Sequence, residues 1–172
     1  MKNIILAAGL SIGLIGCASL PTPTEKPFTE VVQVVDLPNQ SKDDLFESSK
    51  IWMAKTFRSS NNVVQYADKG TGSIVGKGTF PYPCKGFMDC SAFGKDYIGF
   101  TLKIDTKENK ARVSFSDLTW KSMPSVSAGV YNRGGEFPLR TVQMQEQVKE
   151  KIESIIQQYK TDVVKQQSDT NW

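Results

Sequence analysis

The sequence predicts one α+β domain, built as a single antiparallel sheet of about five strands with two helices packed on one face. Two amphipathic helical patterns, one near each end of the chain, predict the helices. Between them, runs rich in Val, Ile and Phe alternate with polar residues and are joined by short turn segments, as in antiparallel hairpins. A chain of 172 residues with 39% hydrophobic and 23% charged residues has the size and composition of one domain.

The first strand and the first helix follow one another directly. Residues 28–37 are rich in Val and end at a Pro-Asn pair, which predicts a strand and a turn. Ser41 then caps a helix over residues 41–60. Asp43 and Asp44 lie in its first turn, where acidic side chains favour the helix dipole, so we interpret them as capping charges. The helix carries one apolar stripe, which we expect in the core, formed by Leu45, Phe46, Trp52, Met53 and Phe57.

Four further strands are predicted over residues 63–68, 73–80, 97–105 and 111–120. The third of these alternates cleanly, with Ile98, Phe100, Leu102 and Ile104 on one face and Tyr97, Thr101 and Lys103 on the other. One apolar and one polar face is typical of an antiparallel sheet that is covered on one side only.

The last helix, over residues 141–165, has the most regular pattern in the chain. Its apolar residues recur with the helical period and are Met144, Val148, Ile152, Ile155, Ile156, Tyr159 and Val163. We expect this helix to lie on the apolar face of the sheet beside the first helix, which completes a domain over residues 28–165. Residues 166–172 should fray.

Residues 1–16 are typical of a signal peptide, because Lys2 precedes an apolar, uncharged run too short to cross a bilayer. The run ends in Gly16-Cys17 and resembles the lipobox of bacterial lipoproteins, in which the Cys is diacylated and becomes the new N-terminus. Ordinary cleavage after Ala18 is the alternative. Ala18 next to the lipidated Cys17 also resembles an outer-membrane sorting signal, so the periplasmic side of that membrane is the expected location in a host with two membranes. Residues 17–27 are expected to form a flexible Pro/Thr tether.

Lipidation of Cys17 would leave Cys84 and Cys90 as an even pair in an oxidising compartment, so we expect a disulfide between them. For so short a loop the chain-entropy contribution is only about 2.4 kcal/mol, so the bond would shape a loop more than hold the domain together. A metal site would need more ligands than two thiols, and the spacing is not the redox motif Cys-x-x-Cys.

The chain contains no His, which removes Ser-His-Asp triads, Cys-His pairs and His-ligated metal sites. The glycine-rich residues 70–78 do not have P-loop spacing, and we interpret them as a hairpin turn. A formal net charge of +3 is small for a nucleic-acid binder. We therefore expect no catalytic residues, no metal, no cofactor and no nucleic-acid partner.

Two segments, SKDDLFESSKIWMAKTF and NNVVQYADKGTGSIVGKGTF, resemble a bacterial family of unknown function with a fold like that of the TATA-binding protein. The likeness covers about residues 28–159, and it implies one half of the saddle of that fold, in the order strand, helix, four strands, helix. It implies no activity. The resemblance to the DNA-binding protein is architectural only, because this chain has one half-repeat, little excess charge and an export signal.

The polar sheet face is the candidate partner surface, and its residues are Lys77, Thr79, Thr101, Lys103, Arg112 and Ser114. Two long connections, residues 81–95 and 121–140, carry aromatic and apolar residues that either fold back over the sheet ends or border this surface. The chain is thus interpreted as a membrane-tethered interaction or scaffold module that contacts another envelope protein or a cell-wall polymer. The alternative is a small-ligand binder or an enzyme that uses a cleft beside the sheet.

Overall fold

The structure is a computed structural model that describes residues 21–26, 28, 30–57, 63–127 and 129–168. The strands are β1 (Glu30–Asp36), β2 (Val64–Asp68), β3 (Ser73–Pro81), β4 (Tyr97–Lys107), β5 (Lys110–Ser122), β6 (Ser125–Ser127), β7 (Val130–Asn132) and β8 (Gly135–Pro138). The helices are α1 (Lys42–Thr56), α2 (Gly86–Phe93) and α3 (Val142–Ser168).

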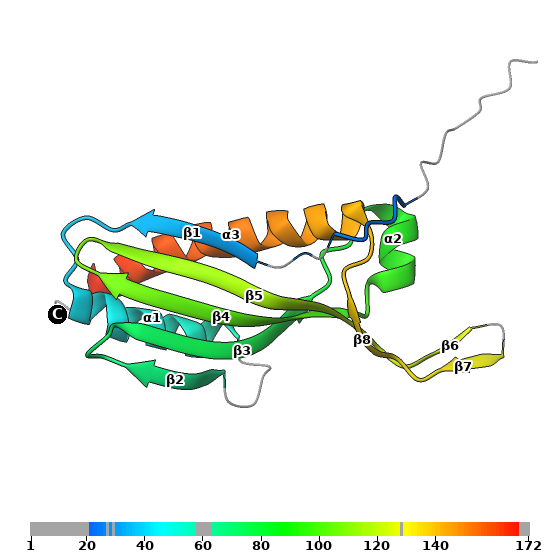
Figure 1. Ribbon diagram of the computed structural model, residues 1–172, viewed down its shortest axis with the longest axis horizontal. Coiled ribbons are helices and arrows are strands. Elements are labelled where there is room, and N and C mark those ends of the chain that lie inside the picture. Colours follow the sequence, from blue (N-terminus) through cyan, green and yellow to red (C-terminus); the bar gives the residue numbers. More distant parts are fainter. Residues whose placement is uncertain (1–20, 27, 29, 58–62, 128, 169–172) are drawn as a thin grey trace, which may run out of the picture.

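Five strands form an antiparallel sheet in the order β1-β5-β4-β3-β2, and β8 pairs with the far end of β5 (Figure 1). β5 therefore changes partner along its length: it pairs with β1 up to Ser116 and with β8 from Thr119 onward. A bulge separates the two halves, and Asp117 within it has a left-handed φ of 51°. Strands β6 and β7 form a separate two-stranded ribbon. The predicted α+β class is confirmed.

Helices α1 and α3 pack against each other and against one face of the sheet, and both lie behind it in Figure 1. The predicted apolar face of β4 is buried, and so are the predicted stripes of both helices. On β5, Ala111, Val113 and Phe115 complete this core. The predictions of one apolar sheet face and of two helices that cover it are therefore confirmed.

A polar contact and a ring contact join the two helices inside the core. The hydroxyl groups of Ser49 on α1 and Tyr159 on α3 lie 2.8 Å apart, and both side chains are fully buried. Burial raises the pKa of Tyr159 to about 12, so the phenol stays protonated. The Trp52 ring packs edge-on against Tyr159, with 5.0 Å between centroids, and its indole N–H donates to Asp162. At the start of α1, the Ser41 hydroxyl accepts from the Asp44 amide, as the capping pattern predicts.

The structure contains more strands and helices than the sequence predicts. Helix α2 lies within residues 81–95, and none of its residues is buried, so it leaves no apolar periodicity in the sequence. Strands β6, β7 and β8 lie within residues 121–140 and are only three or four residues long, too short for a clear alternation. Helix α3 continues to Ser168, so residues 166–168 are helical where fraying is expected. Residues 169–172 lie outside the described residues.

The expected tether differs in its second half. Residues 21–26 lie along the start of α3: the Thr24 amide donates to the Arg140 carbonyl, and the Thr22 carbonyl accepts from the Val142 amide. The side-chain amide of Gln145 also donates to the Lys26 carbonyl at 2.8 Å. These bonds make the segment part of the domain. The expected signal peptide and Cys17 lie outside the described residues.

The buried hydroxyl pair gives a direct test of the α1–α3 contact. Tyr159→Phe leaves the Ser49 hydroxyl buried without its partner, so we expect the free energy of unfolding to fall by about 1–3 kcal/mol. The double variant S49A/Y159F removes both polar groups and should recover most of that loss. Urea unfolding followed by circular dichroism measures both changes. A double variant no more stable than Y159F would contradict the role of this pair.

Candidate functional site

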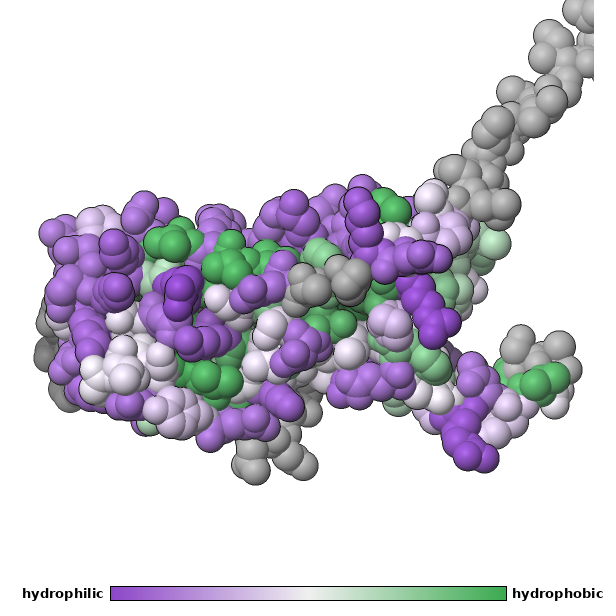
Figure 2. All heavy atoms as spheres, viewed as in Figure 1, coloured by the Kyte–Doolittle hydropathy of each residue, from purple (hydrophilic) through white to green (hydrophobic). Residues whose placement is uncertain are grey.

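The sheet face opposite the helices is uncovered, and we refer to it as the open face (Figure 2). It is formed by the side chains that alternate with the core positions of the strands. In register across the sheet these include Val32, Ser114, Lys103, Val75 and Tyr66 in one row, and Val34, Arg112, Asp105, Ser73 and Asp68 in the next. Hydrophilic and hydrophobic side chains are mixed on it.

All six predicted surface residues lie on the open face. Lys77 of β3 stands next to Thr101 of β4, and Lys103 of β4 stands next to Ser114 of β5. Two of the six are less accessible than the sequence predicts. Ser114 is buried, in register between Lys103 and Val32, and the Thr101 hydroxyl oxygen is buried without a hydrogen-bond partner in the described part of the chain.

The open face is organised around Asp105, which the sequence analysis did not select. Its carboxylate is only 16% exposed and accepts hydrogen bonds from Ser73 at 2.5 Å and from Arg112 at 2.6 Å. The Lys103 ammonium lies 3.1 Å away. Burial raises the pKa of this carboxyl, but the hydrogen bonds from Ser73, Arg112 and Lys103 together outweigh it, and the pKa lies below its usual value.

Glu136 of β8 is a second carboxylate of the open face, and it pairs with a cation at the other end of this face. It accepts a 2.6 Å hydrogen bond from the Thr119 hydroxyl, and the Lys121 ammonium lies 3.5 Å away. The hydrogen bond from Thr119 and the charge of Lys121 hold the pKa of Glu136 below its usual value. Lys77 adds to the same positive field. Two of the three predicted cations of this face, Lys103 and Arg112, therefore already have a carboxylate partner.

Apolar side chains are exposed on both edge strands of the open face. Val32 and Val34 project from β1, and Tyr66 projects from β2, each about half exposed. Sequence reasoning missed them because the run VVQVV is apolar on both faces and so carries no alternation. Asp105 could have been found from its spacing, since it lies two residues after Lys103 and thus on the same face.

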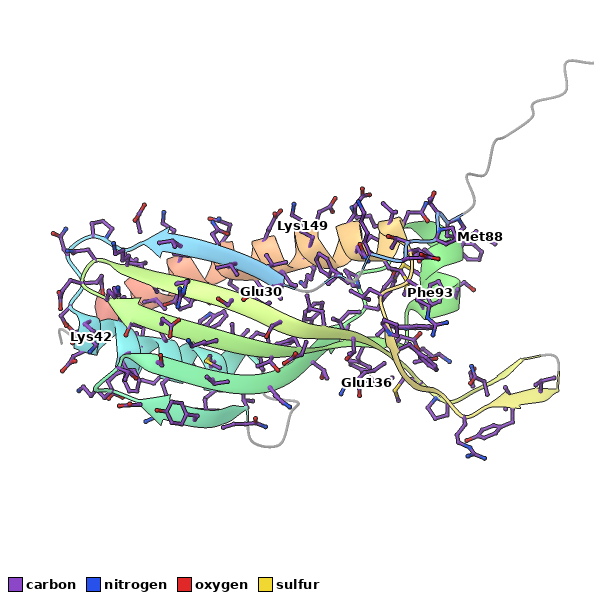
Figure 3. The ribbon with its side chains drawn as sticks, in the orientation of Figure 1. Glu30, Lys42, Met88, Phe93, Glu136 and Lys149 are labelled. Carbon is purple, nitrogen blue, oxygen red and sulfur yellow. A yellow bond between two sulfur atoms is a disulfide. The ribbon has the colours of Figure 1, made fainter. Side chains whose placement is uncertain are left out.

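Strand β1 and helix α3 form the walls of an open groove of about 820 Å³ beside the sheet. Figure 3 labels Glu30 and Lys149 on its two sides, and Gln33, Glu153 and Gln157 also line it. In the described ranges, no group of three or more His, Cys, Asp or Glu side chains could hold a metal ion. None of the described helices is long and apolar enough to cross a membrane.

Cys84 and Cys90 form a disulfide, with their Cα atoms 4.9 Å apart, as expected from the sequence. The bond ties the residue two positions before α2 to the second turn of that helix. Phe93, the last residue of α2, packs its ring against Tyr82 and Trp120. Part of the long connection therefore folds back over the sheet end, while the first turn of α2 stays exposed.

The sequence profile of a domain of unknown function (DUF4468) with a TBP-like fold matches residues 31–121. The chain belongs to this family. The matched range runs from β1 to the end of β5, so it includes most of the open face and α2 but not the ribbon or α3. No functionally curated protein matches the sequence.

Two solved structures share the fold of this DUF4468 protein. A DUF4468 family protein from Bacteroides ovatus is 11% identical with a TM-score of 0.55, over 82% of this chain and 87% of that chain. A TBP-like protein from Parabacteroides distasonis is 13% identical with a TM-score of 0.58, over 82% of this chain and 96% of that chain. At these identities the likeness shows the fold alone.

Asp105 should make stability depend on pH. Its folded-state pKa is lowered, so its charge stabilises the fold above about pH 4, and this contribution is lost as the pH falls through the folded-state pKa. We expect Asp105→Asn to lower the free energy of unfolding by about 1–3 kcal/mol at pH 7, and the difference from wild type to shrink below about pH 4. Urea unfolding at several pH values measures this. Asp36→Asn, at an exposed carboxylate of β1, is the control, and an equal loss in both variants would contradict the prediction.

Proposed function

We propose that this protein is a non-catalytic interaction module, held at the cell envelope by a lipid on Cys17, that presents the open face to another envelope protein. The observation that carries the proposal is the composition of that face. Lys103 and Arg112 pair with Asp105 and Lys121 pairs with Glu136, while Val32, Val34 and Tyr66 are exposed on the two edge strands.

This pairing favours a protein partner over a polyanion. Asp105 offsets one of the two charges of Lys103 and Arg112, and Glu136 offsets the charge of Lys121, so the positive field that could attract a nucleic acid or an anionic cell-wall polymer is reduced. Recognition then depends on apolar contacts at Val32, Val34 and Tyr66 and on the polar groups between them. Exposed apolar side chains beside charges that are already paired are compatible with a protein interface.

Strand β1 supplies a second means of recognition. It is the end strand of the sheet order, and its outer side borders the groove with α3. Partner proteins commonly add a strand to such an edge, which satisfies its backbone groups. The same groove also supports the second candidate function, binding of a small polar ligand, which a molecule that co-purifies with the protein and contacts Gln33 would favour.

The proposed anchor rests on the sequence around Cys17, where Leu14 and Gly16 precede the Cys behind a short apolar run. Two acyl chains on one Cys give stable membrane attachment, whereas one chain is marginal. Under this proposal Ala18 directs the protein to the periplasmic side of the outer membrane in a host with two membranes.

The anchor is tested by substitution of Cys17. Cys17→Ser should abolish incorporation of labelled palmitate in cells, because the acyl chains have no other attachment point. The double variant C84S/C90S removes the other two thiols and should keep the label, which makes it the matched control. Palmitate retained by the C17S chain would refute lipidation at this site.

The interaction surface is tested in cells by chemical crosslinking and mass spectrometry, which identify the partner. The double variant V32S/V34S should then reduce its capture about tenfold, the effect expected when two apolar contacts of an interface are lost. Both side chains are exposed, so folding should be unaffected. Lys151→Ser, on the exposed side of α3, is the control. Equal capture by V32S/V34S and wild type would refute the surface, and crosslinks to a wall polymer alone would refute the choice of a protein partner.

A further inference from the structure

Helix α2 and the ribbon of β6 and β7 protrude at one end of the long axis of the molecule (Figure 1). In α2, Phe87 is 85% exposed and Met88 is 79% exposed. In the ribbon formed by β6 and β7, Val126, Val130 and Tyr131 are exposed. A cavity of about 410 Å³ separates α2 from the ribbon and is lined by residues of both. We refer to α2, the ribbon and residues 21–26 together as the α2 end.

Polar contacts hold both protrusions against the body of the domain. Lys85 pairs with Glu150 of α3, and Gln147 of α3 donates to Asp89 of α2 at 2.9 Å. At the base of the ribbon, the buried Asp96 carboxylate accepts from the Met123 amide and from the Trp120 indole, both at 2.9 Å. Because these contacts and the disulfide position the protrusions, their apolar side chains are presented outward rather than folded into the core. Figure 3 labels Met88 and Phe93 on α2.

The charges of α2 and of the ribbon suit a membrane surface. Arg133 is the one charged residue in the sequence from 123 to 134, so the ribbon carries no acidic group. Asp89 is the one charged residue in the sequence of α2, and it is engaged by Gln147 and by the Lys85 amide. Exposed aromatic and aliphatic side chains beside a cation are typical of proteins that lie in the headgroup region of a bilayer.

The start of the described chain lies at the same end. Pro21 lines a cavity of about 400 Å³ together with Met88 and Phe93 of α2. Residues 21–26 are hydrogen-bonded to the start of α3, so they do not add length to a flexible tether. Four peptide units separate Cys17 from Pro21, and even fully extended they span only about 14 Å.

We infer that the α2 end is a membrane-contact surface: Phe87, Met88 and the apolar residues of the ribbon insert into the headgroup region of a phospholipid bilayer. The inference rests on the proposed lipid at Cys17, because the short link then holds Pro21 within about 14 Å of the acylated residue. Side chains of interfacial proteins reach about 5–10 Å into a bilayer, and Pro21 lines one cavity with Met88, so the anchor brings α2 within range. The ribbon lies at the same end of the molecule. The anchor thus brings the domain to the membrane, and the α2 end orients it there.

The test uses the full chain, processed in cells, purified and reconstituted into vesicles of phosphatidylethanolamine and phosphatidylglycerol. A photoreactive phenylalanine analogue replaces Phe87 or Tyr131, and the matched control carries it at Tyr66, an exposed aromatic residue of the open face. After irradiation, mass spectrometry counts lipid adducts at each position. Insertion should give at least about tenfold more adduct at positions 87 and 131 than at position 66.

The same spectra separate this inference from the anchor, because they also report the mass of the N-terminal peptide. A diacylated Cys17 with equal adduct yields at all three positions would overturn membrane contact and leave the anchor standing. An unmodified Cys17 would overturn the anchor and, with it, the contact. Irradiation of intact cells gives a further outcome: adducts at 87 and 131 to a protein instead of lipid would assign the α2 end to a protein interface and refute the inference.

Discussion

Burial of only one face of the sheet is the constraint on which the rest of the structure depends. The apolar side chains of β4 and β5 must be covered, and α1 and α3 are the described helices with buried stripes that can do so. Both lie on that one face, joined by the Ser49–Tyr159 pair. The opposite face therefore meets solvent, and two of its carboxylates, Asp105 and Glu136, are paired with neighbouring cations on the same face.

What could be predicted from the sequence follows from this constraint. One-sided burial imposes a period of two on β4 and a helical period on α3, and both patterns are plain in the residues. Helix α2 and the ribbon bury no apolar stripe and are held by a disulfide and by Asp96, so no periodicity reveals them. For the open face, alternation placed Lys103 and Arg112 correctly and puts Asp105 on the same face as Lys103. The pairing of Arg112 with Asp105 depends on strand register, which alternation does not specify.

Membership in the DUF4468 family explains the architecture of the domain but assigns no function to it. Function must therefore be argued from the surfaces of this chain. The DUF4468 match ends at residue 121, where β5 is nearly complete, yet the core also requires α3, which lies after the match. The ribbon lies after it as well. The open face and the α2 end are thus two separate surfaces on one scaffold, one built on the sheet within the matched range and one built largely from the connections between elements.

The change of partner along β5 divides the domain into regions that can open independently. The ladder to β1 ends at Ser116 and the ladder to β8 starts at Thr119, with the bulge at Asp117 between them. Breaking the short β8 ladder would free one side of the ribbon, whose base Asp96 still holds at the Met123 amide, without disturbing the β1 ladder or the helix-covered core. Amide hydrogens of β8 should then exchange with solvent by local opening, while those of β4 exchange only when the whole domain unfolds. The ribbon can therefore adjust to what it contacts at little expense to global stability.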